Sequence, residues 1–248
     1  MALPDATDVT DSPESVLDDP AWHSLAGPHR RLAEGSDPDA ATPPLALRYP
    51  ADVSPFGAVA SWHDPGVWQA VLDLVGPDAP FVAPPPEVEL PPGWRVPERF
   101  PGVQLVETSV LTPRPDPEAV ELGPDDVTEM LALVGRTQPG PFLPHTIEMG
   151  RYIGFRREGR LVAMAGERLH PPGWTEISAV CTDVEERGRG LATRLVLDVA
   201  HHVRQRGNRV LMHASAANED AIGLYLRLGF RLRRTVTFGS VLTPADRA

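Results

Sequence analysis

Proline restricts the possible folds of this chain more than any other feature, because it is abundant and concentrated in one half. Of the 29 prolines in 248 residues, 22 lie before residue 119. Proline lacks a backbone N–H and has a fixed φ, so it is excluded from helix interiors and central strands. We therefore expect neither in the proline-broken segments 83–86 and 90–97, and we predict a domain boundary near residue 117.

The first 117 residues divide further by composition. Residues 1–19 are rich in Asp, Pro, Ser and Thr, which predicts a disordered tail. Residues 20–117 carry enough tryptophan and aliphatic residues for an ordered accessory domain. Within it, Val67, Val71 and Val75 recur at a spacing of four, which predicts a helix over 65–75.

Composition excludes several classes of protein. All 23 basic residues are arginine, so the chain has no P-loop lysine and no lysine that could anchor pyridoxal phosphate. Cys181 is the single cysteine, which excludes an internal disulfide or a cysteine-rich zinc site. The net charge of −11 lies entirely in the first 100 residues and disfavours nucleic acid or an anionic membrane as a partner. With no signal-like start and no apolar run of 18 residues, we expect a soluble, cytoplasmic protein.

Residues 118–248 follow a different pattern. Period-two and helical spacings predict strands at 120–122, 152–155, 161–165, 175–182, 209–214 and 232–238, with helices at 124–134, from 191 to about 206, and at 221–228. Two early strands form a hairpin around a Glu-Gly turn, and the later strands alternate with helices. The order predicts an α/β (α+β) fold, a mixed and mostly antiparallel sheet flanked by helices.

A glycine-rich bend joins the 175–182 strand to the following helix. In Arg187-Gly188-Arg189-Gly190, the glycines permit positive φ and close approach of a ligand. The helix start offers unpaired N–H groups and a partial positive charge, which suit a pyrophosphate. A purely structural turn is the alternative. A dinucleotide fold is disfavoured, because Thr193 replaces the third small residue and no acidic residue ends the next strand.

A second motif covers residues 218–230. Asn218 is a typical N-cap, Ala221 and Tyr225 lie on one helical face, and Gly229 ends the helix. Tyr225 needs a polar partner for its hydroxyl, so it is either a structural tyrosine or a functional one.

Together the two motifs resemble the GNAT superfamily of N-acetyltransferases. The pattern Arg187-x-x-Gly190-x-Ala192, then a helix and a strand, then Asn218-x-x-Ala221 continuing to Tyr225 is similar to that superfamily's pyrophosphate loop and last helix. The resemblance covers about residues 118–240, the expected GNAT domain at 118–248. Residues 150–182 further resemble the glycine N-acyltransferase-like branch.

The resemblance implies an acyl-CoA-dependent N-acyltransferase that uses acetyl-CoA as co-substrate and needs no metal. It implies that the thioester is attacked directly by an amine of a small molecule or peptide. The implied contacts are the backbone of Val180, Cys181 and Thr182 for the pantetheine arm, the N–H groups of Arg187, Gly188, Arg189, Gly190, Leu191, Ala192 and Thr193 for the pyrophosphate, and Asn218 and Ala221 on the last helix. Tyr225 would protonate the leaving thiolate.

The sequence leaves three candidates for the general base. The resemblance places Glu176 as the first candidate, on the same strand as the bend, whereas its alternative role is to bind substrate or an arginine. Glu167 and His213 are the second and third candidates. A non-catalytic CoA-binding module on the same fold is the competing function, and a homodimer is compatible with the sequence.

The accessory segment 20–117 carries no catalytic constellation. One interpretation is a degenerate partial copy of the same α/β unit. The other is a lid that shapes the acceptor pocket.

Overall fold

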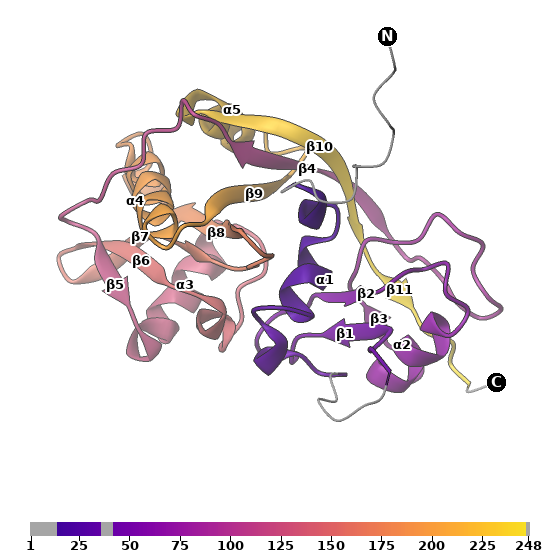
Figure 1. Cartoon of the computed structure of the whole chain (residues 1–248). Coiled ribbons are helices and arrows are strands. Elements are labelled where there is room, and N and C mark those ends of the chain that lie inside the picture. Colours follow the sequence, from indigo (N-terminus) through magenta and orange to yellow (C-terminus); the bar gives the residue numbers. More distant parts are fainter. Residues whose placement is uncertain (1–13, 36–41, 247–248) are drawn as a thin grey trace, which may run out of the picture.

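The computed structural model describes residues 14–35 and 42–246, which form two lobes joined by two long strands (Figure 1). The helices are α1 (Pro20–Leu25), α2 (Val67–Val75), α3 (Val127–Thr137), α4 (Leu191–Gln205) and α5 (Glu219–Leu228). The strands are β1 (Ala46–Arg48), β2 (Gly57–Val59), β3 (Pro80–Phe81), β4 (Arg99–Glu107), β5 (Val120–Leu122), β6 (Tyr152–Arg157), β7 (Arg160–Glu167), β8 (Trp174–Thr182), β9 (Arg209–Ser215), β10 (Phe230–Gly239) and β11 (Val241–Leu242).

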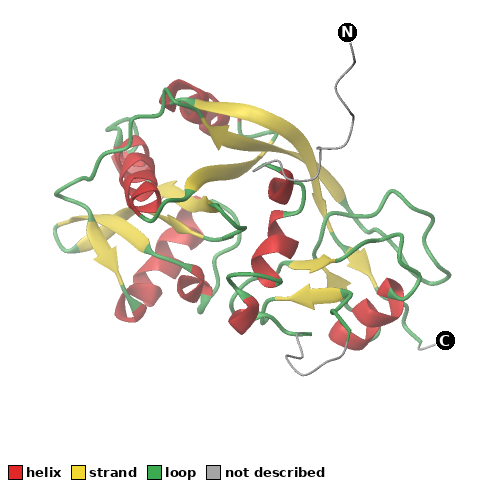
Figure 2. Ribbon diagram, viewed as in Figure 1, coloured by secondary structure: helices red, strands yellow, loops and turns green. Residues whose placement is uncertain are grey.

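A seven-stranded sheet forms the larger lobe, in the order β10-β4-β9-β8-β7-β6-β5. Only β8 and β9 are parallel, and the other neighbours are antiparallel. The elements after residue 117 lie close to their predicted positions. The mixed, mostly antiparallel α/β sheet flanked by helices is therefore confirmed (Figure 2).

Helices α3 and α4 cover opposite faces of this sheet. On β6, Tyr152 packs in the cluster that contains Met130 of α3, whereas its neighbour Ile153 packs in the cluster that contains Leu195 of α4. Successive residues of a strand point to opposite faces, so the two helices enclose the sheet between them. No helix in the described part of the chain is both long and apolar enough to cross a bilayer.

Strand β4 departs from the sequence prediction. Residues 99–107 were assigned to the accessory segment, yet β4 pairs with both β9 and β10 inside the sheet. Pro101 is tolerated because it lies near the start of the strand, opposite Thr237. The predicted boundary at residue 117 thus leaves one strand of the sheet on the accessory side, and the division into domains stays a prediction.

The smaller lobe is built from both ends of the chain. Its sheets pair β1 with β2 and β3 with β11, and β11 lies near the C-terminal end of the described residues. Its apolar core likewise combines Phe81 with Val241. Leu169, which follows β7 of the larger lobe, packs in the same cluster as Leu25. Strands β4 and β10 run side by side between the lobes (Figure 1).

The tail predicted as disordered also differs in part. Residues 1–13 lie outside the described residues. Residues 14–19 hold a 3-10 turn at Ser15–Leu17, and Leu17 packs in a buried cluster with Val106 and Trp174. The composition of this segment is polar, but its one leucine gives it an apolar anchor in the sheet.

Candidate active site

A cleft opens in the sheet where β8 parts from β9. Their parallel pairing covers Trp174 to Glu176 and stops there, so residues 177–182 have no partner on the β9 side. Ala179 has a φ of 52°, and the β7–β8 register shifts beside it. This β-bulge bends β8 away from β9 and leaves backbone groups open to a ligand. The cleft encloses about 600 Å³ between the two lobes.

The backbone N–H groups of the predicted pantetheine contacts do not all point toward the cleft. The N–H of Asp183 donates to the carbonyl of Val162 on β7. Since N–H directions alternate along the regular part of a strand, that of Thr182 faces the opened side and that of Cys181 faces β7. Val180 lines the cleft. Cys181 is buried on the α3 side, where burial raises the pKa of its thiol to about 11.

The glycine bend has the backbone that the sequence predicts. Gly188 and Gly190 have φ values of 77° and 73°, and a side chain on either would meet open space. Among the described residues, the N–H groups of 188–193 have no backbone acceptor, and the first N–H bonded at the start of α4 is that of Arg194, which donates to the carbonyl of Gly190. Arg189 contacts Glu186, and Arg187 donates to the carbonyl of Thr182. The bend is thus an exposed cluster of unpaired N–H donors at a helix start.

Arg194 lies in the first turn of α4, but its side chain pairs with a carboxylate and is not free to add charge to the bend. Its guanidinium binds both oxygens of Asp116 at 2.6 and 2.7 Å and lies over the ring of Phe155. The Arg194–Asp116 ion pair therefore holds segment 114–117 against α4, and the positive charge of Arg194 is not directed at the glycine bend.

Helix α5 brings the second motif to the cleft. Asn218 caps it by accepting from the N–H of Ala221, and both residues line the cleft together with Tyr225. Tyr225 is 6% exposed, and burial, with a smaller contribution from Cys181, raises the pKa of its phenol to about 12. The hydroxyl is therefore protonated at neutral pH and available as a donor.

Glu176 makes the arginine contact that the sequence analysis gave as the alternative to a general base. It is fully buried, and its two carboxylate oxygens accept from Arg168 at 2.6 and 2.9 Å and from His213 Nδ1 at 2.7 Å. Burial raises the pKa of this carboxyl, but Arg168 and His213 outweigh burial and hold the pKa below its ordinary value. Arg168 and His213 line the cleft, whereas Glu176 lies behind them. An ion-paired carboxylate with a lowered pKa is a poor general base.

The two other predicted bases are also engaged. Glu167 is buried against Arg206 at 2.7 Å, and it does not line the cleft. His213 lies in the cleft wall between Glu176 and Gln104, whose side-chain nitrogen is 3.0 Å from His213 Nε2.

His202, on α4, contacts Asp198 and Gln205, and the described residues hold no group of three side chains suited to a metal ion.

Several cleft residues escaped sequence analysis. Arg168 follows β7 and lies under the ring of Phe56, which comes from the smaller lobe. Gln104 is on β4, the strand that the proline pattern concealed. Their sequence contexts carry no motif, since their contacts depend on chain segments far apart in sequence.

Comparison with known proteins identifies the fold. Residues 152–238 match the family model described as FR47-like protein. The crystal structure of a protein from the GNAT family of Novosphingobium aromaticivorans DSM 12444 is 39% identical, with a TM-score of 0.78, over 95% of this chain and 100% of that one. The mycothiol acetyltransferases of Thermomonospora curvata and Thermobispora bispora are 28% and 31% identical over 75% and 61% of this chain.

An opened parallel strand pair beside a glycine bend and a tyrosine-bearing last helix defines a GNAT-type acetyltransferase fold. Since the Novosphingobium protein is matched over its full length, the chain belongs to the GNAT family. It spans only 60% and 51% of the lengths of the two mycothiol acetyltransferases.

Proposed function

We propose that this protein is an acyl-CoA-dependent N-acetyltransferase that moves an acetyl group from acetyl-CoA to a primary amine by direct attack. The observation that carries the proposal is the opening of β8 from β9 beside Tyr225. This opening gives an extended ligand a strand edge to pair with and a phenol at its end. The glycine bend supplies N–H donors for a diphosphate.

The cofactor-binding roles follow from these positions. The N–H groups of Val180 and Thr182 would pair with the pantetheine amides as an added strand does. Asn218 and Ala221 would contact the arm from α5. The N–H groups from Gly188 to Thr193 would hold the diphosphate, with Arg187 and Arg189 beside them.

In the proposed reaction, the amine nitrogen bonds to the thioester carbon and the C–S bond breaks. Holding the two reactants in one cleft supplies much of the rate, and the N–H of Val180 can polarise the carbonyl. Tyr225 donates its proton to the departing sulfur, and the amine nitrogen releases one proton, which returns to the Tyr225 oxygen directly or through water. Since Glu176, Glu167 and His213 are all engaged, we infer that the acceptor reacts as the neutral amine drawn from solution. Glu176 instead positions Arg168 and His213.

The smaller lobe supplies one side of the proposed acceptor site. Phe56 and Pro84 from this lobe, with Phe100 and Phe238 from β4 and β10, line the same cleft as Tyr225. This placement supports the predicted lid over the acceptor pocket. The relatives' name, mycothiol acetyltransferase, supports a small-molecule acceptor because it names a thiol compound. The glycine N-acyltransferase-like branch, a homodimer and a cytoplasmic location stay predictions.

Substituting Gly190→Val tests the cofactor site. A β-branched residue is strained at a φ of 73°, by about 1–3 kcal/mol, so the bend will change shape. We expect the dissociation constant for CoA, measured by calorimetry, to rise at least about tenfold, which corresponds to about 1.4 kcal/mol.

Gly207→Val is the matched control. Gly207 has a φ of 81° and equally open surroundings, but it follows the other end of α4. If both variants bind CoA alike, the bend is not the diphosphate site.

Tight CoA binding without amine-stimulated thiol release by the wild-type chain would favour the non-catalytic module.

Substituting Phe56→Ala tests the acceptor site. Loss of the apolar ring from the cleft should raise KM for the amine about tenfold, from about 1–2 kcal/mol of lost burial, and leave KM for acetyl-CoA unchanged. Leu32→Ala is the control, because Leu32 packs in the same cluster as Phe56 but does not line the cleft. Equal effects of the two variants on the amine KM would contradict the placement.

A further inference from the structure

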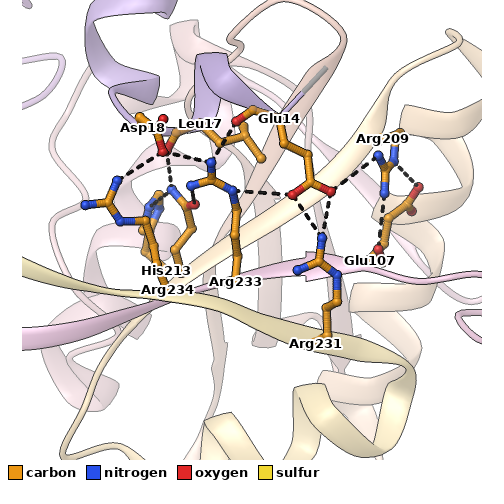
Figure 3. Close-up of polar contacts among 10 residues, drawn as sticks. Glu14, Leu17, Asp18, Glu107, Arg209, His213, Arg231, Arg233 and Arg234 are labelled. Atoms are coloured by element: carbon orange, nitrogen blue, oxygen red, sulfur yellow. Dashed lines mark hydrogen bonds and ion pairs between the residues drawn. The ribbon is translucent and has the colours of Figure 1, made fainter. Parts of the chain in front are cut away.

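Residues 14–18 form an N-terminal latch that is held across strand β10 by three arginines (Figure 3). The carboxylate of Glu14 accepts from Arg231 at 2.7 and 2.9 Å. That of Asp18 accepts from Arg233 at 2.7 Å and from Arg234 at 3.1 Å. Arg233 also donates to the carbonyl of Glu14. The latch therefore has a fixed position relative to the sheet, and Asp18 lines the cleft.

Gln104 connects the latch to the cleft. Its side chain is 1% exposed, its Oε1 accepts from Arg233 Nη1 at 2.9 Å, and its Nε2 donates to the carbonyl of Leu17 at 2.8 Å. A guanidinium only donates and a carbonyl only accepts, so these two contacts permit one orientation of the amide. The amide nitrogen consequently faces His213 Nε2 at 3.0 Å.

This contact decides which nitrogen of His213 carries the proton. An amide nitrogen is a donor only, so His213 Nε2 must accept and is unprotonated. Nδ1 lies 2.7 Å from the Glu176 carboxylate and donates to it. The ring is therefore neutral, with its proton on Nδ1, although a carboxylate lies beside it.

We propose that Gln104 is a positioning residue of the cleft, through which the N-terminal latch holds His213 in the neutral Nδ1–H tautomer. Protonation at Nε2 would place two N–H groups against each other, unless the amide turned over and lost its bonds to Leu17 and Arg233. The charged groups around the ring are Glu176, Arg168 behind it, and Arg233 and Asp18 across Gln104.

A neutral ring matters to the reaction proposed above, on which this part of the inference rests. An imidazolium in the cleft wall would donate its proton to the neutral amine, and the resulting ammonium ion could not attack the thioester. With the latch closed, the Nδ1–H tautomer avoids this effect. The latch, residues 14–18, thereby acts on the cleft from outside the GNAT sheet.

The test is imidazole nitrogen NMR on the full-length chain labelled with ¹⁵N-histidine, with His213→Gln to assign the resonance. We expect wild-type His213 to show the Nδ1–H pattern at pH 7. Gln104→Glu places an acceptor opposite Nε2, and we expect His213 to become imidazolium. Arg233→Gln releases the amide and should shift the resonances in the same direction. Arg234→Gln is the matched control, because Arg234 contacts Asp18 but not Gln104.

Kinetics give a second measurement. In Gln104→Glu, the imidazolium can protonate the neutral amine, so kcat/KM for the amine should fall about fivefold while KM for acetyl-CoA stays unchanged. An Nε2–H or imidazolium pattern in the wild type, or an unchanged pattern in Gln104→Glu, would overturn the proposal. The NMR measurement needs no acetyl transfer, so its result stands apart from the success or failure of the proposed function.

Discussion

Substituting Glu176→Gln should lower the free energy of unfolding at pH 7 by about 3 kcal/mol. The carboxylate is fully buried and binds Arg168 through two oxygens, and Arg168 is only 12% exposed. Glutamine leaves the guanidinium buried without its counter-charge. Removal of one partner of a buried pair destabilises far more than loss of a surface ion pair.

The pH dependence of stability has a definite sign at this position. Arg168 and His213 overcome burial and hold the pKa of Glu176 below its ordinary value. A carboxyl with a lowered folded-state pKa stabilises the protein above its unfolded pKa of about 4.3 and loses that contribution as pH falls through the folded pKa. The difference in stability between the wild type and Glu176→Gln should therefore be full at pH 7 and shrink in strong acid.

Urea unfolding at several pH values measures both effects. Glu167→Gln is the matched control, because its partner Arg206 is 44% exposed and can be rehydrated, so we expect a loss nearer 1 kcal/mol. If Glu176 were the general base, its variant would instead unfold like the wild type and lose the acidic limb of the kcat/KM profile. That outcome would contradict the positioning role.

The parts of the fold that sequence predicts are those with local causes. Helix α5 runs from Glu219 to Leu228 because Asn218 caps its start and Gly229, with a positive φ, follows its end. The bend before α4 is predicted by Gly188 and Gly190 in the same way. Strand β4 has no such signal, since its pairing joins Val103 to Ala214 and Thr235. The energy of that pairing depends on residues more than a hundred positions away.

The residues of the candidate site likewise differ in whether a local sequence motif predicts them. Tyr225 and Asn218 are predicted because the last-helix motif contains them. The sequence also identifies Glu176 as a candidate functional carboxylate. It does not predict the pKa of that carboxyl, because the pKa depends on Arg168, which the chain after β7 brings within 3 Å. A residue type on a strand predicts candidate chemistry, whereas its pKa depends on contacts made across the sheet.

Substituting Tyr225→Phe should lower kcat about 100-fold, or about 2.7 kcal/mol in the activation free energy. The phenol lines the cleft from α5, and its pKa of about 12 keeps it protonated throughout the working range of pH. A thiolate forms as the C–S bond breaks, and phenylalanine removes the hydroxyl that would donate to it. Steady-state kinetics with acetyl-CoA and a reactive amine measure the loss.

The effect should fall on kcat alone. CoA affinity should change less than about threefold, because the ring remains packed against Phe230 and only the O–H is lost. Tyr152→Phe is the matched control, since that hydroxyl is fully buried among the described residues with no hydrogen-bond partner. Its removal should leave turnover unchanged and stability unchanged or higher. Equal turnover of the Tyr225→Phe variant and the wild type would exclude Tyr225 as the proton donor and require the thiolate to leave unassisted or to take its proton from water.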